Sequence, residues 1–173
     1  YGDDVARVQA FRPDSTWVRA TGQFGTGEGE LRRPMSLCFD ATSREVYVAD
    51  AVNHRLVVLA LDDGRWLRTI GAPGRGPGQL DFPYDVVLDD ERRLWVAEFG
   101  NQRVQVLDPR DGACLGTWGQ PGRRVGALAR PWGLALGRGD RLWVLDSNND
   151  RVYAIDRARV LSAPAAGKIP AAR

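Results

Sequence analysis

Three acidic residues, each followed five positions later by an arginine, recur along the chain and are its clearest candidates for chemistry. The pairs repeat every 48 residues and are Asp50 with Arg55, Glu98 with Arg103, and Asp146 with Arg151. Carboxylates that converged could bind a metal ion, whereas a carboxylate that faced its own arginine across a hairpin would form an ion pair. Because the pairs recur unit by unit, we interpret them as structural pairs that fix strand register, each worth about 0.2–1 kcal/mol.

The four residues between each acid and its arginine include a recurring asparagine: Asn53, Asn101 and Asn149. Asparagine tolerates the left-handed backbone conformation, so we interpret these residues as turn formers. His54, the only histidine, follows the first of them, and Gln102 and Asp150 hold the equivalent positions. Zinc sites and histidine-based triads need a histidine among other ligands or beside a nucleophile. We therefore expect an exposed turn residue at position 54.

Two glycine-rich segments, 25–29 and 74–78, superficially resemble phosphate-binding loops. A phosphate loop needs a helix N-terminus directly after it, or a Gly-Lys-Ser/Thr ending. Here a proline and an apolar run follow, which predicts a strand. The sequence therefore argues against nucleotide binding and identifies these segments as connections between repeating units.

Each unit of the repeat predicts four short β-strands. In the second unit they are roughly 84–88, 94–98, 103–107 and 114–118, which are rich in Val, Leu, Trp and Tyr and are bounded by turn residues. No segment shows apolar periodicity of 3.6 residues over the length of an ordinary helix. Four antiparallel strands at this period are typical of a β-propeller blade, whereas a β-solenoid would repeat over fewer residues. We therefore predict an all-β propeller segment built from four-stranded antiparallel blades.

The repeat resembles that of the NHL-repeat β-propellers, whose hairpin signature Val-Ala-Asp-x-x-Asn-x-Arg is complete at residues 48–55. The second copy has Glu98 in place of aspartate, and the third has Leu145 in place of alanine and Asp150 in place of histidine. The resemblance covers about residues 3–157. The Trp-Asp strand end of WD40 units and the Gly-Gly pair of kelch units do not occur at the matching positions. The resemblance implies wedge-shaped blades, usually six in a closed ring.

The register divides the chain into two complete blades and two partial ones. We predict the outer strands of a partial blade at 1–22, complete blades at 23–71 and 72–119, a blade lacking its last strand at 120–160, and a disordered tail at 161–173. Such a set cannot close a six-bladed ring alone. We expect a C-terminal fragment whose remaining blades complete the ring, or two copies that assemble into one ring.

In such a propeller, the residue after the recurring proline starts the innermost strand, at the mouth of the central channel. Aromatic residues at this position should share one face with the hairpin turns and the connecting loops, and aromatics and arginine are enriched at interaction hot spots. The predicted ligand or partner face comprises Arg33, Met35, Tyr84, Phe99, Asn101, Arg123, Arg124, Arg130 and Trp132. Packing against neighbouring blades is the alternative for Met35, Tyr84 and Trp132, and we expect it of Tyr47, Trp95 and Trp143.

The overall composition excludes few functions. The 173 residues are 43% hydrophobic and 27% charged, as in ordinary globular proteins, and a net charge of +2 does not by itself indicate nucleic-acid binding. Lys168 is the only lysine beside many arginines, a bias typical of GC-rich bacterial genomes. Cys38 and Cys114 fall on a first and a fourth strand, too far apart for a disulfide, and should be buried. No run of 18 apolar residues predicts membrane insertion, and no motif for a cofactor or a metal emerges.

Three functions are compatible with the sequence. We favour a non-enzymatic scaffold whose loop face binds a protein or peptide. The second hypothesis is binding of single-stranded RNA, known for some NHL propellers, with Arg123, Arg124 and Arg130 beside Trp132. The third is a propeller enzyme of the gluconolactonase or amidating-lyase kind, whose site would lie in the remaining blades. The turn position of the only histidine weakens the amidating-lyase hypothesis, because that enzyme uses a histidine-bound zinc.

Overall fold

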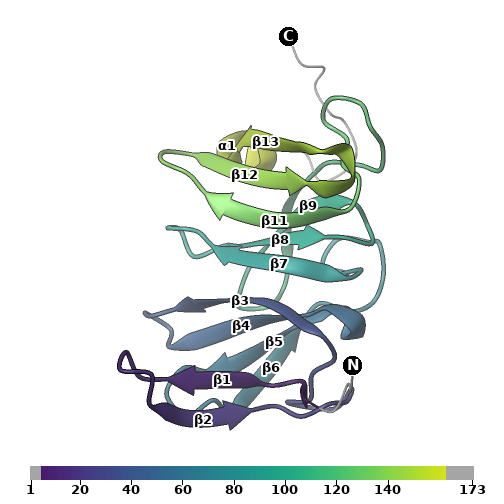
Figure 1. Cartoon of the computed structure of the whole chain (residues 1–173). Coiled ribbons are helices and arrows are strands. Elements are labelled where there is room, and N and C mark those ends of the chain that lie inside the picture. The colour runs from purple at the N-terminus through teal and green to yellow at the C-terminus, as the bar shows by residue number, and fades with distance from the viewer. Residues whose placement is uncertain (1–4, 163–173) are drawn as a thin grey trace.

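The computed structural model describes residues 5–162, which form thirteen strands in four antiparallel sheets (Figure 1). The first sheet contains β1 (Val8–Phe11) and β2 (Trp17–Thr21). The second contains β3 (Pro34–Asp40), β4 (Glu45–Asp50), β5 (Arg55–Ala60) and β6 (Trp66–Ile70). The third contains β7 (Pro83–Leu88), β8 (Leu94–Glu98), β9 (Arg103–Leu107) and β10 (Cys114–Trp118). The fourth contains β11 (Pro131–Leu136), β12 (Arg141–Asp146) and β13 (Arg151–Asp156), and is followed by helix α1 (Arg157–Ser162).

The sheets lie face to face in chain order, as blades of a propeller do (Figure 1). β3 contacts β7 and β7 contacts β11, so the first strand of each blade is its inner strand. Within the described residues no sheet closes on itself, and the blades form an open segment. The predicted fold class, an all-β propeller segment of antiparallel blades, is confirmed.

The core consists of the layers between successive blades, because alternate side chains of a strand face opposite neighbours. Tyr47 and Leu56 of one blade pack with Val86 and Leu94 of the next. The following layer repeats this arrangement with Trp95, Ala97 and Val104 against Leu134, Leu142 and Val144. Each blade is therefore stabilised chiefly by its neighbours, as expected of a repeat protein.

A β-bulge follows the recurring proline in every inner strand. The register shifts between Pro34 and Ser36, between Pro83 and Asp85, and between Pro131 and Gly133. Met35, Tyr84 and Trp132 are the residues left without a cross-strand partner. A bulge turns the strand locally and re-aims the extra side chain, so all three residues leave the regular alternation of the sheet.

Two expectations fail at the last blade. Trp143 was expected to pack between blades but is 42% exposed, whereas Tyr47 and Trp95 at the equivalent positions are 1% and 0% exposed. The reason is that no sheet of the described residues covers this side of β12. Residues 161 and 162 were assigned to a disordered tail but belong to α1, whose Val160 is buried against the last two blades. The remainder of the predicted tail, 163–173, lies outside the described residues.

Candidate functional site

The carboxylate of each repeated acid–arginine pair is buried. The side chains of Asp50, Glu98 and Asp146 have no exposed area, and the Nε atom of the partner arginine lies 2.9, 2.5 and 2.8 Å from a carboxylate oxygen. The predicted energy assumed an exposed ion pair, whereas these carboxylates are buried. Removing one partner of a buried pair leaves an uncompensated charge and costs about 3–5 kcal/mol.

Each pair also tethers the loop that enters its blade. Arg103 donates to three carbonyl oxygens of this loop at 2.8–3.1 Å, those of Arg75, Gly76 and Gln79. Glu98 accepts the N–H of Asp81 at 3.0 Å, and the other two units repeat these contacts. Burial raises the pKa of Glu98, and hydrogen bonds from Arg103 and Asn101 offset part of the rise. These carboxylates are occupied by protein donors, which supports a structural role.

The asparagines belong to the same network. Asn101 donates to the Glu98 carboxylate at 2.6 Å and to the Gly74 carbonyl at 2.8 Å, and Asn53 and Asn149 make the equivalent bonds. The left-handed residues are the next ones along the chain, His54, Gln102 and Asp150, with φ of 55°, 54° and 51°. The expectation that asparagine supplies the left-handed conformation was wrong by one residue.

His54 joins two blades. Its side chain is 25% exposed, and its Nδ1 lies 3.0 Å from Oδ1 of Asp81 and accepts the N–H of Phe82 at 3.2 Å. The imidazole also packs edge-on against the Phe82 ring. Both partners belong to the loop before β7. His54 is a turn residue, as expected, but the expectation that it is exposed was wrong. One feature of the sequence could have indicated this contact: Phe82 precedes Pro83, whereas the other two units have arginine before the proline.

Five residues from three blades form a stack that we call the aromatic–arginine column: Arg33, Tyr84, Phe99, Arg130 and Trp132. The Tyr84 and Phe99 rings stack with centres 4.4 Å apart, and Trp132 meets them edge-on at 5.6 and 6.4 Å. The guanidinium carbon of Arg33 lies 5.6 Å from the centre of the Tyr84 ring, and that of Arg130 lies 5.3 Å from the Phe99 ring. The order is thus guanidinium, ring, ring, guanidinium.

The backbone explains why these side chains meet. Tyr84 and Trp132 are the bulged residues of β7 and β11, and Phe99 directly follows β8. Arg33 and Arg130 each precede an inner strand and adopt the left-handed conformation, with φ of 61° and 54°. The starts of β7 and β11 and the end of β8 lie at the same end of the stacked blades, on the right in Figure 1.

The members of the column differ in exposure. Tyr84 is 6% exposed and Phe99 is half-buried, whereas Trp132 is 48% exposed and both arginines are exposed. The packed rings of Tyr84 and Phe99 support the guanidinium groups of Arg33 and Arg130 through cation–π contacts. The column can therefore present two cations and one indole to a ligand while its inner rings pack between blades.

The other predicted face residues do not join the column. Met35 is half-buried in the equivalent bulge of β3, and Asn101 is used by the Glu98 network. Arg123 and Arg124 lie exposed on the loop before β11, where their carbonyl oxygens accept hydrogen bonds from Arg151. The structure thus brings together Arg33, Tyr84, Phe99, Arg130 and Trp132 out of the nine residues predicted for this face.

Asp85 was not predicted as a site residue from the sequence. One carboxylate oxygen accepts the Ser36 hydroxyl at 2.5 Å, and the other accepts the N–H of Leu134 at 2.7 Å. It therefore links the three inner strands β3, β7 and β11 directly beside the bulged Tyr84. The available signal was an acidic residue within an otherwise apolar inner strand.

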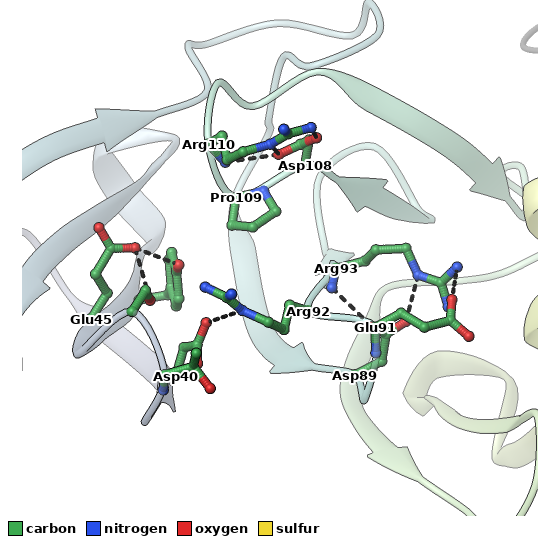
Figure 2. Close-up of polar contacts among 12 residues, drawn as sticks. Asp40, Glu45, Asp89, Glu91, Arg92, Arg93, Asp108, Pro109 and Arg110 are labelled. Atoms are coloured by element: carbon green, nitrogen blue, oxygen red, sulfur yellow. Dashed lines mark hydrogen bonds and ion pairs between the residues drawn. The ribbon is translucent and has the colours of Figure 1, made fainter.

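A cleft of about 390 Å³ lies between the two complete blades at the opposite end from the column. Its lining includes the arginines Arg68, Arg92 and Arg110, each paired with a carboxylate: Glu45, Asp40 and Asp108 respectively. Figure 2 shows Arg92 reaching from the β7–β8 turn to Asp40 of the neighbouring blade. Two of these arginines also cross between the blades, since Arg92 pairs with Asp40 and Arg68 donates to the Pro109 carbonyl at 2.8 Å, so we interpret the cleft as a clamp between blades.

This clamp predicts a pH effect at Glu45. Hydrogen bonds from Arg68, at 2.5 and 3.0 Å, lower the pKa of Glu45 below its ordinary value. A lowered folded-state pKa stabilises the fold above the unfolded pKa, and this contribution is lost as pH falls through the folded pKa. Glu45→Gln should therefore lower the free energy of unfolding by up to about 1 kcal/mol at neutral pH, with the difference shrinking in acid. Urea unfolding at neutral and acidic pH measures this, with the exposed Asp62→Asn as control; a difference independent of pH would contradict it.

Within residues 5–162, no three His, Cys, Asp or Glu side chains are grouped to hold a metal ion. Cys38 and Cys114 are free and half-buried rather than buried, and burial, with smaller effects of Asp85 and Asp40, raises the pKa of Cys38 to about 12. Among the same residues, no helix has the length and apolar character needed to cross a membrane.

A family model described as "SMP-30/Gluconolactonase/LRE-like region" matches residues 18–133, more than half of the chain. The chain belongs to this SMP-30/gluconolactonase/LRE-like family. A second model, the NHL repeat, matches residues 128–152 and confirms the resemblance to NHL-type propellers. No curated protein sequence matches this SMP-30/gluconolactonase/LRE-like chain.

Solved structures support the fold of the SMP-30/gluconolactonase/LRE-like chain. A Bacteroides caccae protein of unknown function is 13% identical, with a TM-score of 0.63 over 87% of this chain and 56% of its own. Virginiamycin B lyase from Staphylococcus aureus is 14% identical, with a TM-score of 0.54 over 72% of this chain and 38% of its own. The chain thus spans little more than half of one of these proteins and less than half of the other.

Proposed function

We propose that this propeller segment is a non-enzymatic scaffold that binds a protein or peptide through the aromatic–arginine column. The single observation that carries the proposal is the arrangement of the column. Two exposed guanidinium groups and a half-exposed indole are held by rings that are themselves packed between blades. Tryptophan, tyrosine and arginine are the residues in which the binding energy of protein interfaces concentrates.

Rigidity is the second support for this proposal. The column rests on the bulges of two inner strands, and Asp85 ties those strands to β3. A preorganised site loses little side-chain entropy when it binds, so a small surface can give useful affinity. Because Tyr84 is nearly buried, replacing it would also disturb packing, and Trp132 is the better residue for a binding test.

Selection of peptides from a random phage-displayed library on the chain tests this function. Trp132→Ala should weaken binding of the selected peptides about tenfold or more, because an exposed anchor at the centre of the site is removed. Trp17→Ala, which removes a tryptophan that is 58% exposed on β2, is the matched control and should change binding little. Equal losses in both variants, or none with Trp132→Ala, would contradict the proposed site.

An enzymatic function is the second candidate. It is favoured by the match of residues 18–133 to the SMP-30/gluconolactonase/LRE-like family model. The matching model carries gluconolactonase in its description, and one structural neighbour is a lyase. For this chain we would place such a site where the inner strands of a complete ring converge. Lactone hydrolysis by the chain, measured together with its metal content, tests this candidate.

A further inference from the structure

The two guanidinium groups of the column lack carboxylate partners among the described residues. The ion pairs of residues 5–162 instead involve other arginines, among them Arg55, Arg103, Arg151 and Arg157. The guanidinium carbons of Arg33 and Arg130 each lie over one of the stacked rings, and neither guanidinium group makes a hydrogen bond among the described residues. A guanidinium held in this way is ready to bind a carboxylate in a two-pronged hydrogen bond.

The column also limits how far apart these two cations can be. The separations from Arg33 to Tyr84, from Tyr84 to Phe99 and from Phe99 to Arg130 together reach about 15 Å. This total is the upper limit of the distance between the two guanidinium carbons. An extended peptide advances about 3.3–3.4 Å per residue, so the limit corresponds to about four residues.

From this arrangement we infer that the column recognises an extended acidic segment of a partner protein, with two carboxylates about four residues apart or closer. Arg33 and Arg130 would each bind one carboxylate. Trp132, which meets both inner rings edge-on, would contact an apolar side chain between them. This inference rests on the proposed binding function and adds the chemistry of its ligand.

The packing of the column favours a peptide over single-stranded nucleic acid. Base recognition by stacking needs aromatic faces that are open to the ligand. Tyr84 and Phe99 stack on each other at an angle of 21° between their planes, and their outer sides carry Arg33 and Arg130. Trp132 is then the only ring of the column with substantial exposure, which suits one apolar side chain better than a run of bases.

Fluorescence anisotropy with synthetic peptides tests the inference on the whole chain. The probe is a labelled nine-residue peptide with two glutamates four residues apart, leucine midway and glycine elsewhere. We expect it to bind about tenfold or more tightly than the same peptide with lysine in place of glutamate, and a peptide with one glutamate to fall between them. Equal binding of the glutamate and lysine peptides, or no binding of either, would overturn the inference.

Substitutions in the column provide the second arm. Arg33→Gln and Arg130→Gln should each weaken binding of the two-glutamate peptide about tenfold, while Arg33→Lys should restore only part of the affinity because lysine lacks the planar fork. Arg124→Gln, exposed on the same end of the blades but outside the column, is the matched control and should change binding little. An equal loss with Arg124→Gln would indicate unspecific attraction and overturn the inference. Thermal unfolding of each variant confirms that the fold is intact.

The library selection separates failure of this inference from failure of the proposed function. If selected peptides depend on Trp132 but lack acidic residues, the binding function stands and the acidic ligand is overturned. If no selected peptide depends on Trp132, the binding function itself fails. A labelled oligouridine that binds through Arg33 and Arg130, where the two-glutamate peptide does not, would overturn the inference in favour of RNA.

Discussion

Arg103→Met should lower the free energy of unfolding by about 3–5 kcal/mol. The Glu98 carboxylate has no exposed area, and the Arg103 guanidinium is its charged partner at 2.5 Å. Methionine fills much of the same volume but leaves Glu98 without that partner, and it also releases three carbonyl oxygens of the loop before β7. Urea unfolding followed by tryptophan fluorescence measures the loss, and a cost below about 1 kcal/mol would mean that the pair behaves as an exposed one.

Two further variants identify the buried charge as the cause of this loss. Replacing both partners, as Glu98→Gln with Arg103→Met, should cost less than Arg103→Met alone, because no uncompensated carboxylate then remains. Arg124→Met removes an exposed arginine of the neighbouring loop and should change stability little. If the double variant is the least stable of the three, the lost loop contacts rather than the buried charge dominate.

The strand order and most strand boundaries could be predicted from the sequence because the repeat supplies several samples of the same unit. β8, β9 and β10 begin and end where the second unit predicted, and β7 begins one residue earlier, at Pro83. Proline is tolerated there because the first residue of a strand need not donate to the ladder. Comparing the repeat units with one another therefore located the strands, as an alignment of related sequences would.

Repetition also misled wherever a residue's surroundings differ between units. Trp143 repeats Tyr47 and Trp95 in sequence, yet only the latter two are covered by a following blade. His54 replaces a glutamine and an aspartate, but the loop it meets carries Asp81 and Phe82. The sequence shows which residues are equivalent, while burial depends on what packs against each of them.

The candidate site was only partly predictable for a similar reason. Composition and register placed nine residues at one end of the blades, but contacts within the column depend on two bulges and on the left-handed Arg33 and Arg130. Non-glycine residues adopt the left-handed conformation uncommonly, and nothing in the local sequence predicts it. Arg123 and Arg124 have the same residue type and were predicted on the same face, but they do not join the column. The backbone carbonyl oxygens of their loop accept hydrogen bonds from Arg151.

Leu80→Ala should lower the free energy of unfolding by about 3–5 kcal/mol, the range typical of a buried leucine that leaves a cavity. Leu80 is 0% exposed and reaches from the loop before β7 into the layer between the two complete blades. Leu31 and Leu128 occupy the equivalent positions and are 1% and 0% exposed, so the chain uses one such leucine in each described layer. Urea unfolding measures the effect, and Leu115→Ala, on the 38%-exposed leucine of β10, is the control.

A double-mutant cycle with Gly71 shows why leucine sits nine residues after glycine in each unit. Gly71 has a φ of +83°, and a Cβ atom added there would lie 2.7 Å from Cδ1 of Leu80. Gly71→Ala should therefore destabilise the fold both through backbone strain and through this clash. In the background of Leu80→Ala the clash is gone, so the same substitution should cost less, and the two effects should not add. Strict additivity would mean that Leu80 packs independently of Gly71, and that the spacing reflects only the turn that glycine needs.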